Sequence, residues 1–320
     1  MVMQVPGPLG AHNWQPMAFS PATGLAYIPA REQGMVMFNQ PQYKWQKGDV
    51  NIGSSGVFGF TFDLVTPAER AATEGIVKSV AGIPSPDTKE VLIAWDPVTQ
   101  TERWRVPTGR EEWAGGGVLV TAGNVVMQGN SAGHLFGFNA TTGEQLLDIE
   151  VGTGIMAAPI TYELDGEQYV AVLAGFGGAL STIYPRESAP YRYPNYGRLL
   201  AFKLGGGSTP LPSARVPGTT PEPPALAEDS DSLAARGAVQ FLTKCMGCHG
   251  ARGEKRLSAY PDLHRLQPAT YAAFDSIVRG GKLASSGMSS FADLLTEADV
   301  KAIRVYLARE QRKLRAEEKP

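Results

Sequence analysis

Two cysteines and a histidine carry the clearest chemistry in this sequence: Cys245, Cys248 and His249 form a Cys-x-x-Cys-His motif. Two thiols about one helical turn apart can each form a thioether with a vinyl group of one haem, and the next residue can then reach the iron. A redox dithiol would leave the histidine unexplained, and a four-ligand zinc site would need more ligands than the nearby His264. The motif therefore predicts covalently bound haem c, with Cys245 and Cys248 as attachment residues and His249 as an iron ligand.

Met288 is the candidate for the second axial ligand of that iron, because haem of the electron-carrying type commonly pairs histidine with methionine. It is the only methionine after the haem motif, and it lies between Gly287 and Ser289 in a loop rich in glycine and serine. Small neighbours allow the backbone to approach a haem edge. The alternative is a loop methionine that packs on the core. We interpret His264 as a surface residue without a role.

A helix must precede the motif, and its predicted extent is Leu233 to about Lys244, with Asp231 or Ser232 as the N-cap. Residues at steps of four, three and four form its apolar face: Ala234, Ala238, Phe241 and Cys245. Gly237 lowers the helix propensity, so we expect it to allow the close approach of another helix.

A second helix is predicted from Thr296 to about Lys313, with Thr296 as the N-cap and Asp299 as its capping-box partner. Its apolar stripe consists of Val300, Ile303, Tyr306 and Leu307. The charged stretch from Arg309 to Lys319 is expected to be a solvated, fraying tail. Together the two helices and the haem motif predict an all-α domain over residues 231–320.

Residues 1–204 have a different pattern, with short runs of β-branched and aromatic residues between turn signals. A turn-like segment at 95–100 recurs 43 residues later, at 138–143, and a second element at 119–127 is matched at 160–172. A period of roughly 40–45 residues with four short strands is the spacing of a propeller blade. We therefore predict a partial all-β propeller of about four blades; a β-sandwich with chance similarity is the alternative.

Residues 205–230 are typical of a semi-rigid linker, because they are rich in Gly, Ser, Pro, Thr and acidic residues and show almost no periodicity. The net charge of −2 gives no basic surface that would favour nucleic acid. No stretch approaches the roughly 20 apolar residues that span a bilayer. No export signal is visible at the start of the chain.

The C-terminal part resembles the small cytochromes c. Gly237 and Phe241 look like the Gly-x-x-x-aromatic pair with which that family's first helix crosses its last helix, and Tyr306 would be the facing aromatic residue. A Pro-x-Leu segment at Pro261 is similar to the one that lies beside the proximal histidine. The resemblance implies that Pro261 offers its carbonyl oxygen to the ring N–H of His249 and so fixes the orientation of that ring.

The N-terminal part is similar to the C-terminal half of pyrroloquinoline quinone (PQQ)-dependent alcohol dehydrogenases, and the whole chain to the end of a quinohaemoprotein alcohol dehydrogenase. The order of several segments before the haem motif carries this similarity: 10–17, 21–29, 94–104, 113–116, 121–129, 141–144, 152–154, 158–159 and 175–178. In that family an eight-bladed propeller holds PQQ and calcium on its axis. The resemblance implies that Asn13 and Trp14 lie at the PQQ pocket and that Ala179 lies near the cofactor; for Trp14, a place in the blade core is the alternative.

The family's catalytic aspartate, its calcium ligands and its vicinal disulfide belong to blades that precede residue 1, so no catalytic residue is assigned in this sequence. The resemblance implies a periplasmic PQQ-dependent alcohol dehydrogenase in which electrons pass from the quinone to haem c and on to an acceptor such as a small redox protein. The alternative is a stand-alone haem c electron-transfer or assembly module without dehydrogenase activity.

Overall fold

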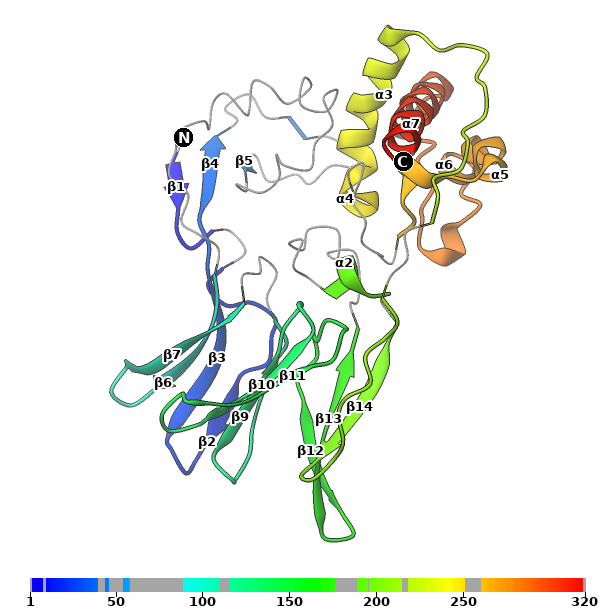
Figure 1. The fold of residues 1–320 in the computed structure, drawn as a ribbon. Helices are drawn as coiled ribbons and strands as arrows, with labels where there is room; N and C mark the ends of the chain where they lie inside the picture. Colours follow the sequence, from blue (N-terminus) through cyan, green and yellow to red (C-terminus); the bar gives the residue numbers. More distant parts are fainter. Residues whose placement is uncertain are drawn as a thin grey trace.

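The computed structural model describes residues 2–7, 10–39, 44–45, 54–57, 89–109, 115–175, 189–194, 196–214, 218–250 and 260–318. Strands dominate the chain up to Lys203, with the short helix α2 (Ala189–Arg192) among them, and helices follow from Asp231 (Figure 1). The described residues of the segment 205–230 form neither helix nor strand. Within the described ranges, no helix combines the length and apolar character needed to cross a membrane.

In the described ranges the strands form four antiparallel sheets. Sheet I consists of β2 (Ala18–Ser20), β3 (Leu25–Glu32), β6 (Lys89–Asp96) and β7 (Thr101–Gly109). Sheet II consists of β8 (Val118–Val120), β9 (Val125–Gly129), β10 (His134–Asn139) and β11 (Gln145–Glu150). Sheet III consists of β12 (Ile160–Leu164), β13 (Glu167–Ala174) and β14 (Arg198–Lys203). A fourth sheet consists of β1 (Val2–Gln4), β4 (Met35–Asn39) and β5 (Ser54–Val57).

Sheet II packs on both of its faces, with sheet I on one side and sheet III on the other (Figure 1). Val126 and Phe138 of sheet II share a buried cluster with Tyr27 of sheet I. Leu135 of sheet II shares a second cluster with Val172 of sheet III. A two-layer sandwich would give each sheet a single buried face. This serial stacking therefore excludes the β-sandwich alternative and confirms a β-sheet-rich, propeller-like N-terminal part.

The repeated turn has the same conformation in two neighbouring sheets. Asp96 Oδ1 accepts hydrogen bonds from the backbone N–H groups two and three residues on, at 2.9 and 3.0 Å, and Asn139 Oδ1 does the same at 2.9 and 3.1 Å. Four residues after each acceptor, Gln100 and Gly143 are left-handed, with φ of 56° and 77°. The second repeated element likewise forms matching hairpins, β8–β9 and β12–β13. The sequence period therefore reflects a structural repeat.

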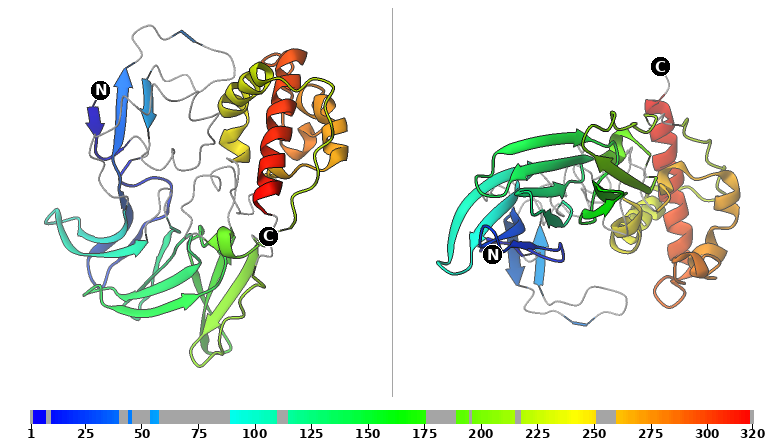
Figure 2. Two further views of the ribbon diagram at one scale, coloured as in Figure 1. Left: turned by 45° about the horizontal axis from the view of Figure 1, so that its top comes forward. Right: turned by 90° about the horizontal axis from the view of Figure 1, so that it is seen from below.

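The helical part contains α3 (Asp231–Lys244), α4 (Met246–His249), η2 (Leu263–Arg265), α5 (Pro268–Ala272), α6 (Phe274–Val278), η3 (Ala284–Ser286) and α7 (Glu297–Glu317). Helix α7 runs between α3 on one side and the α5–α6 segment on the other (Figure 2). Their side chains share one buried core that includes Phe241, Tyr271, Phe274, Ile303 and Tyr306. This core confirms a helical C-terminal part.

Gly237 lies where α3 crosses α7. A Cβ atom at this position would be 2.0 Å from the carbonyl oxygen of Ala302 and 2.8 Å from the Cβ of Tyr306. One turn further along α3, the ring of Phe241 has its centroid 5.3 Å from that of Tyr306. The predicted close approach and the facing aromatic pair are both confirmed, because only a residue without a side chain fits between the two backbones.

The N-cap of α3 is Ser230, so the prediction of Asp231 or Ser232 was wrong by one or two residues. The Ser230 hydroxyl accepts the N–H of Leu233 at 3.3 Å. Asp231 instead occupies the first turn, where a carboxylate interacts favourably with the helix dipole, and its side chain pairs with Arg309 at 2.6 Å.

The capping box predicted for α7 is confirmed. Thr296 Oγ1 accepts the N–H of Asp299 at 3.2 Å, and Asp299 Oδ2 accepts the N–H of Thr296 at 2.9 Å. Burial alone would raise the pKa of Asp299, but the hydrogen bonds from Thr296 and Arg236 outweigh burial and lower it. The carboxylate is therefore ionised near neutral pH and ties the start of α7 to α3.

The fraying tail expected from Arg309 to Lys319 was wrong, because α7 remains helical and partly buried through most of this stretch. Gln311 is fully buried and donates hydrogen bonds to the carbonyl oxygens of Pro221 and Leu266, both at 2.9 Å. Its side-chain oxygen accepts the hydroxyl of Tyr271 at 2.9 Å. These partners come from distant parts of the sequence, so the charge pattern of the helix alone did not reveal them.

Candidate functional site

The Cys-x-x-Cys-His motif lies where α3 ends and α4 begins. The backbone N–H groups of Cys248 and His249 both donate to the carbonyl oxygen of Cys245, at 3.2 and 3.0 Å. This turn separates the two cysteines by one helical turn and places the histidine directly after them, as the motif requires for haem attachment. Both thiols are free of disulfide bonds, with Cys248 exposed and Cys245 half-buried.

The ring of His249 is oriented by a backbone carbonyl. Its Nδ1 lies 2.8 Å from the carbonyl oxygen of Pro261, which confirms the predicted contact. A carbonyl oxygen can only accept, so Nδ1 carries the proton and Nε2 keeps its lone pair for a metal. Burial lowers the pKa of His249, although the Pro261 hydrogen bond opposes the decrease. The imidazole is therefore neutral near pH 7, which is the form that binds iron.

Met288 follows a tight turn at the end of η3. Gly287 is left-handed, with φ of 94°, and the Met288 N–H donates to the carbonyl oxygen of Leu283 at 3.1 Å. The half-buried Met288 side chain packs against the helical core, as do Cys245 and Met246. The structure thus places this sulfur and the motif on one apolar cluster. Packing on that cluster is also what the alternative of a structural methionine predicts.

His264 contradicts its interpretation as a surface residue, because its side chain is fully buried. Its ring makes edge contacts with Phe241 and Tyr306, at centroid distances of 5.2 and 6.3 Å. Asp262 caps η2 by accepting the N–H of His264 at 2.8 Å, and this turn directs the ring inward. No local sequence signal marks this buried position, because the rings that contact His264 belong to distant parts of the chain.

The donor set around the motif fits a covalent haem. Two unbridged thiols and a neutral imidazole follow one another in the motif, and Cys245 packs with the half-buried Met288 against the apolar core of the helical part. Burial raises the pKa of Cys245 to about 12, and neighbouring Cys248 adds to the increase, so the thiol remains protonated near neutral pH. Sulfur and imidazole are ligands suited to a low-spin iron in an apolar pocket.

Two of the three residues assigned to the quinone lie in the loop before β2, and Ala179 lies outside the described residues. Asn13 is exposed, and Trp14 is 52% exposed and belongs to no core cluster of the described ranges. The N–H of Val118 fixes this loop by donating to the carbonyl oxygen of Pro16 at 2.9 Å. An amide and an accessible indole can contact a flat, oxygen-rich quinone.

Comparison with protein families matches both parts of the chain. Residues 1–170 match the model of the glucose/ethanol/alcohol dehydrogenase β-propeller domain, of the PQQ type. Residues 232–307 match the model of subunit III of the cbb3-type cytochrome c oxidase. The first match falls on the propeller-like sheets, and the second falls on the helical part.

The chain is also similar to curated proteins over most of its length. It is 37% identical over 311 residues to quinohemoprotein alcohol dehydrogenase ADH-IIG of Pseudomonas putida, covering 96% of this chain and 40% of the relative. It is 32% identical to 1-butanol dehydrogenase (cytochrome c) of Thauera butanivorans, covering 95% of this chain and 41% of that protein. The chain therefore spans about two fifths of the length of the curated relatives that it matches.

Solved structures agree with these sequence matches. The solved structure of quinohemoprotein alcohol dehydrogenase ADHIIG from Pseudomonas putida superposes with a TM-score of 0.74 at 35% identity, covering 98% of this chain and 43% of that one. Quinohemoprotein alcohol dehydrogenase of Comamonas testosteroni superposes with a TM-score of 0.65 at 28% identity, covering 100% of this chain and 43% of that one.

Proposed function

The chain belongs to the PQQ-type glucose/ethanol/alcohol dehydrogenase β-propeller family, and from this membership we propose that it forms the C-terminal portion of a quinohaemoprotein alcohol dehydrogenase. In this role it would carry electrons through covalent haem c. The observation that carries the proposal is the turn at Cys245, which brings both thiols and the Pro261-oriented His249 together. This turn occurs in a chain whose other part matches the propeller domain of the family.

Within this proposal the haem is held by the residues of the motif. Cys245 and Cys248 would form the two thioethers, and His249 would bind iron through Nε2 while Nδ1 stays on Pro261. Met288 would supply a further iron ligand. Haem held by these residues would supply one-electron chemistry, and a histidine–methionine ligand pair would favour its reduced state.

The proposed role of the propeller part is to contribute one side of the quinone pocket. Asn13 and Trp14 would contact PQQ from the loop that β8 fixes in place, and Ala179 would lie near it. PQQ supplies the two-electron oxidation of the alcohol, and calcium accompanies it in the complete family enzyme. We further propose an alcohol as substrate, a small redox protein as electron acceptor and the periplasm as location. Similarity to 1-butanol dehydrogenase (cytochrome c) supports the first two.

The outer face of sheet III supports a larger propeller. Ile160, Leu164, Leu173 and Leu199 share this face and are 55–70% exposed. Its inner face is buried against sheet II by side chains of the same kind. Because sheets I, II and III already stack through such faces, we propose that a further blade covers this one in the complete enzyme, in which residues 1–204 supply about four blades.

A chimaera tests this function. The preceding blades of Pseudomonas putida ADH-IIG are joined to residues 1–320, loaded with haem, PQQ and calcium, and mixed with an alcohol. The expected result is reduction of the haem, seen in its absorption spectrum, that requires both alcohol and PQQ. The 320-residue chain alone is expected to be reduced by dithionite but not by alcohol. A chimaera that binds both cofactors yet leaves the haem oxidised would contradict the proposal.

Met288→Ala tests the proposed second ligand. Loss of the methionine sulfur is expected to lower the reduction potential and to leave an open iron position that binds added imidazole. Redox titration and imidazole titration of the haem-loaded chain measure the two effects. Met17→Ala, which truncates an exposed methionine of the propeller part, is the control and is expected to change neither. A potential unchanged in Met288→Ala would show that the methionine only packs on the core.

A further inference from the structure

The segment that precedes α3 is bound along α7. We call residues 218–230 the strap. Thr220 is 1% exposed, Pro223 is buried and Leu226 packs against the helical core. The strap contributes backbone acceptors to α7 as well, since Gln311 donates to the carbonyl oxygen of Pro221. This half of the sequence-predicted linker is therefore packed as part of the helical body.

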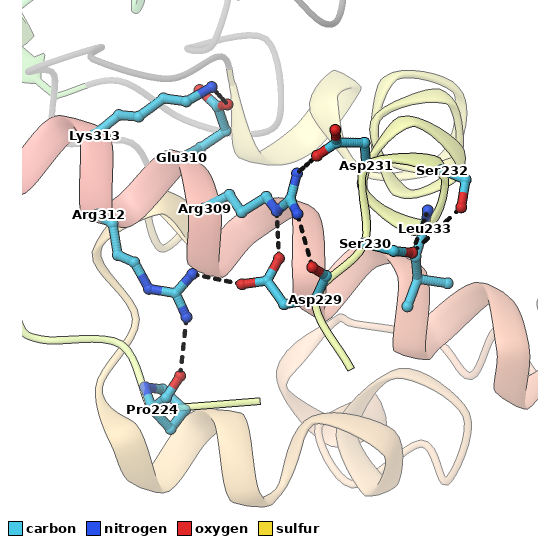
Figure 3. Close-up of polar contacts among 10 residues, drawn as sticks. All are labelled: Pro224, Asp229, Ser230, Asp231, Ser232, Leu233, Arg309, Glu310, Arg312 and Lys313. Atoms are coloured by element: carbon cyan, nitrogen blue, oxygen red, sulfur yellow. Dashed lines mark hydrogen bonds and ion pairs between the residues drawn. The ribbon is translucent and has the colours of Figure 1, made fainter. Parts of the chain in front are cut away.

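Arginines of α7 hold the end of the strap that is nearer to α3 (Figure 3). Arg309 donates to the side chain of Asp229 and, at 2.9 Å, to its carbonyl oxygen, and it pairs with Asp231 at 2.6 Å. Arg312 donates to the other carboxylate oxygen of Asp229 at 2.8 Å. These contacts, led by the hydrogen bond from Arg309, lower the pKa of Asp229.

At the opposite end of the strap, Arg315 of α7 donates to the carbonyl oxygen of Thr220 at 2.8 Å, and an arginine outside α7 adds further contacts. Arg265 donates to the carbonyl oxygen of Gly218 at 3.0 Å and to the hydroxyl of Thr220 at 2.9 Å. Its second terminal nitrogen pairs with Glu318 near the end of α7. The Arg265 side chain is only 16% exposed, so this guanidinium is enclosed by the groups that it joins.

The same guanidinium reaches the turn that orients the proximal histidine. Arg265 Nε lies 3.3 Å from Asp262 Oδ2, in an ion pair. Asp262 follows Pro261 directly, and the Pro261 carbonyl oxygen is the acceptor for Nδ1 of His249. Contacts therefore run without a break from the strap through Arg265 and Asp262 to the histidine.

We propose that Arg265 is a positioning residue, which fastens the strap to the Asp262 turn and thereby holds the Pro261 carbonyl oxygen on His249. The inference rests on the proposed function, because it concerns the electronic state of a haem bound at the motif. A firm hydrogen bond at Nδ1 makes the imidazole a stronger donor and stabilises ferric iron. A loosened turn weakens that bond and favours the reduced state.

Arg265→Gln in the haem-loaded full chain tests the proposal by redox titration. The expected result is a higher reduction potential, with the equilibrium constant for reduction increased on the order of tenfold. The direction is diagnostic, because loss of a positive charge near the haem would by itself stabilise ferric iron and lower the potential. Hydrogen exchange of the strap, which is expected to become faster near Thr220, reports the release of this end.

Arg309→Gln is the matched control, because it removes the same charge and releases the other end of the strap. Faster exchange near Asp229 with an unchanged potential is expected there. Arg265→Lys serves if Arg265→Gln fails to bind haem, since lysine keeps the charge but lacks the planar fork that joins four partners; a higher potential is again expected. An unchanged or lower potential in the Arg265 variants would overturn the inference, whereas a wild-type chain without covalent haem would overturn the proposed function instead.

Discussion

Gly237→Leu is expected to prevent the helical part from folding, or to lower its free energy of unfolding by about 3 kcal/mol or more. Even a Cβ atom at this position would lie 2.0 Å from the carbonyl oxygen of Ala302. That oxygen belongs to the backbone of α7 and cannot move away as a flexible side chain could. The α3–α7 crossing would therefore have to open, and the apolar core that borders the haem motif would open with it.

Urea unfolding followed by circular dichroism measures this effect. Gly197→Leu is the matched control, because a Cβ atom at Gly197 would have no neighbour within 4 Å. Its expected change in unfolding free energy is within about 0.5 kcal/mol. Equal stability of the two variants would mean that the helices do not cross at Gly237.

His249→Ala is expected to remove the proximal ligand while both thioethers keep the haem attached. The iron would lose its low-spin character, because no other imidazole of the described ranges is held by the Pro261 carbonyl oxygen. Absorption and electron paramagnetic resonance spectra of the purified protein detect the change. Added imidazole is expected to restore a low-spin spectrum by filling the vacated position.

His134→Ala is the control for this variant. His134 lies in β10 and pairs with Asp148 at 2.6 Å on the surface of the propeller part, so its loss is expected to leave the haem spectrum unchanged. A wild-type spectrum in His249→Ala would refute the assignment of this histidine to iron.

The features that the sequence predicted correctly depend on neighbours close in the chain. The spacing of Cys245, Cys248 and His249 is a property of one helical turn, and the capping box at Thr296 involves four consecutive residues. Gly237 was informative for a different reason. A glycine inside a helix lowers helix stability, so its presence indicates that another helix packs closely against it. The Pro261 contact came from resemblance to the cytochromes c, not from spacing.

The features that the sequence missed depend on partners far away in the chain. The charged and polar residues Arg309 and Gln311 led to the prediction of a solvated helix end. The prediction failed because their partners in the strap lie about 80–90 residues earlier in the chain. His264 was predicted at the surface, because the residues next to it in the sequence do not indicate that its ring packs against Phe241 and Tyr306. The identity of a polar residue does not indicate whether its hydrogen-bond partner is water or a distant segment of the chain.

Peptide mapping of the haem-loaded wild-type chain tests directly whether Cys245 and Cys248 attach haem covalently. Trypsin cleaves after Lys244 and Arg252, and the peptide between them, residues 245–252, contains both cysteines and His249. Mass spectrometry is expected to find this peptide with one haem added and with both thiols consumed. A peptide 245–252 with two free thiols, recovered from cells that attach haem to other c-type cytochromes, would contradict it.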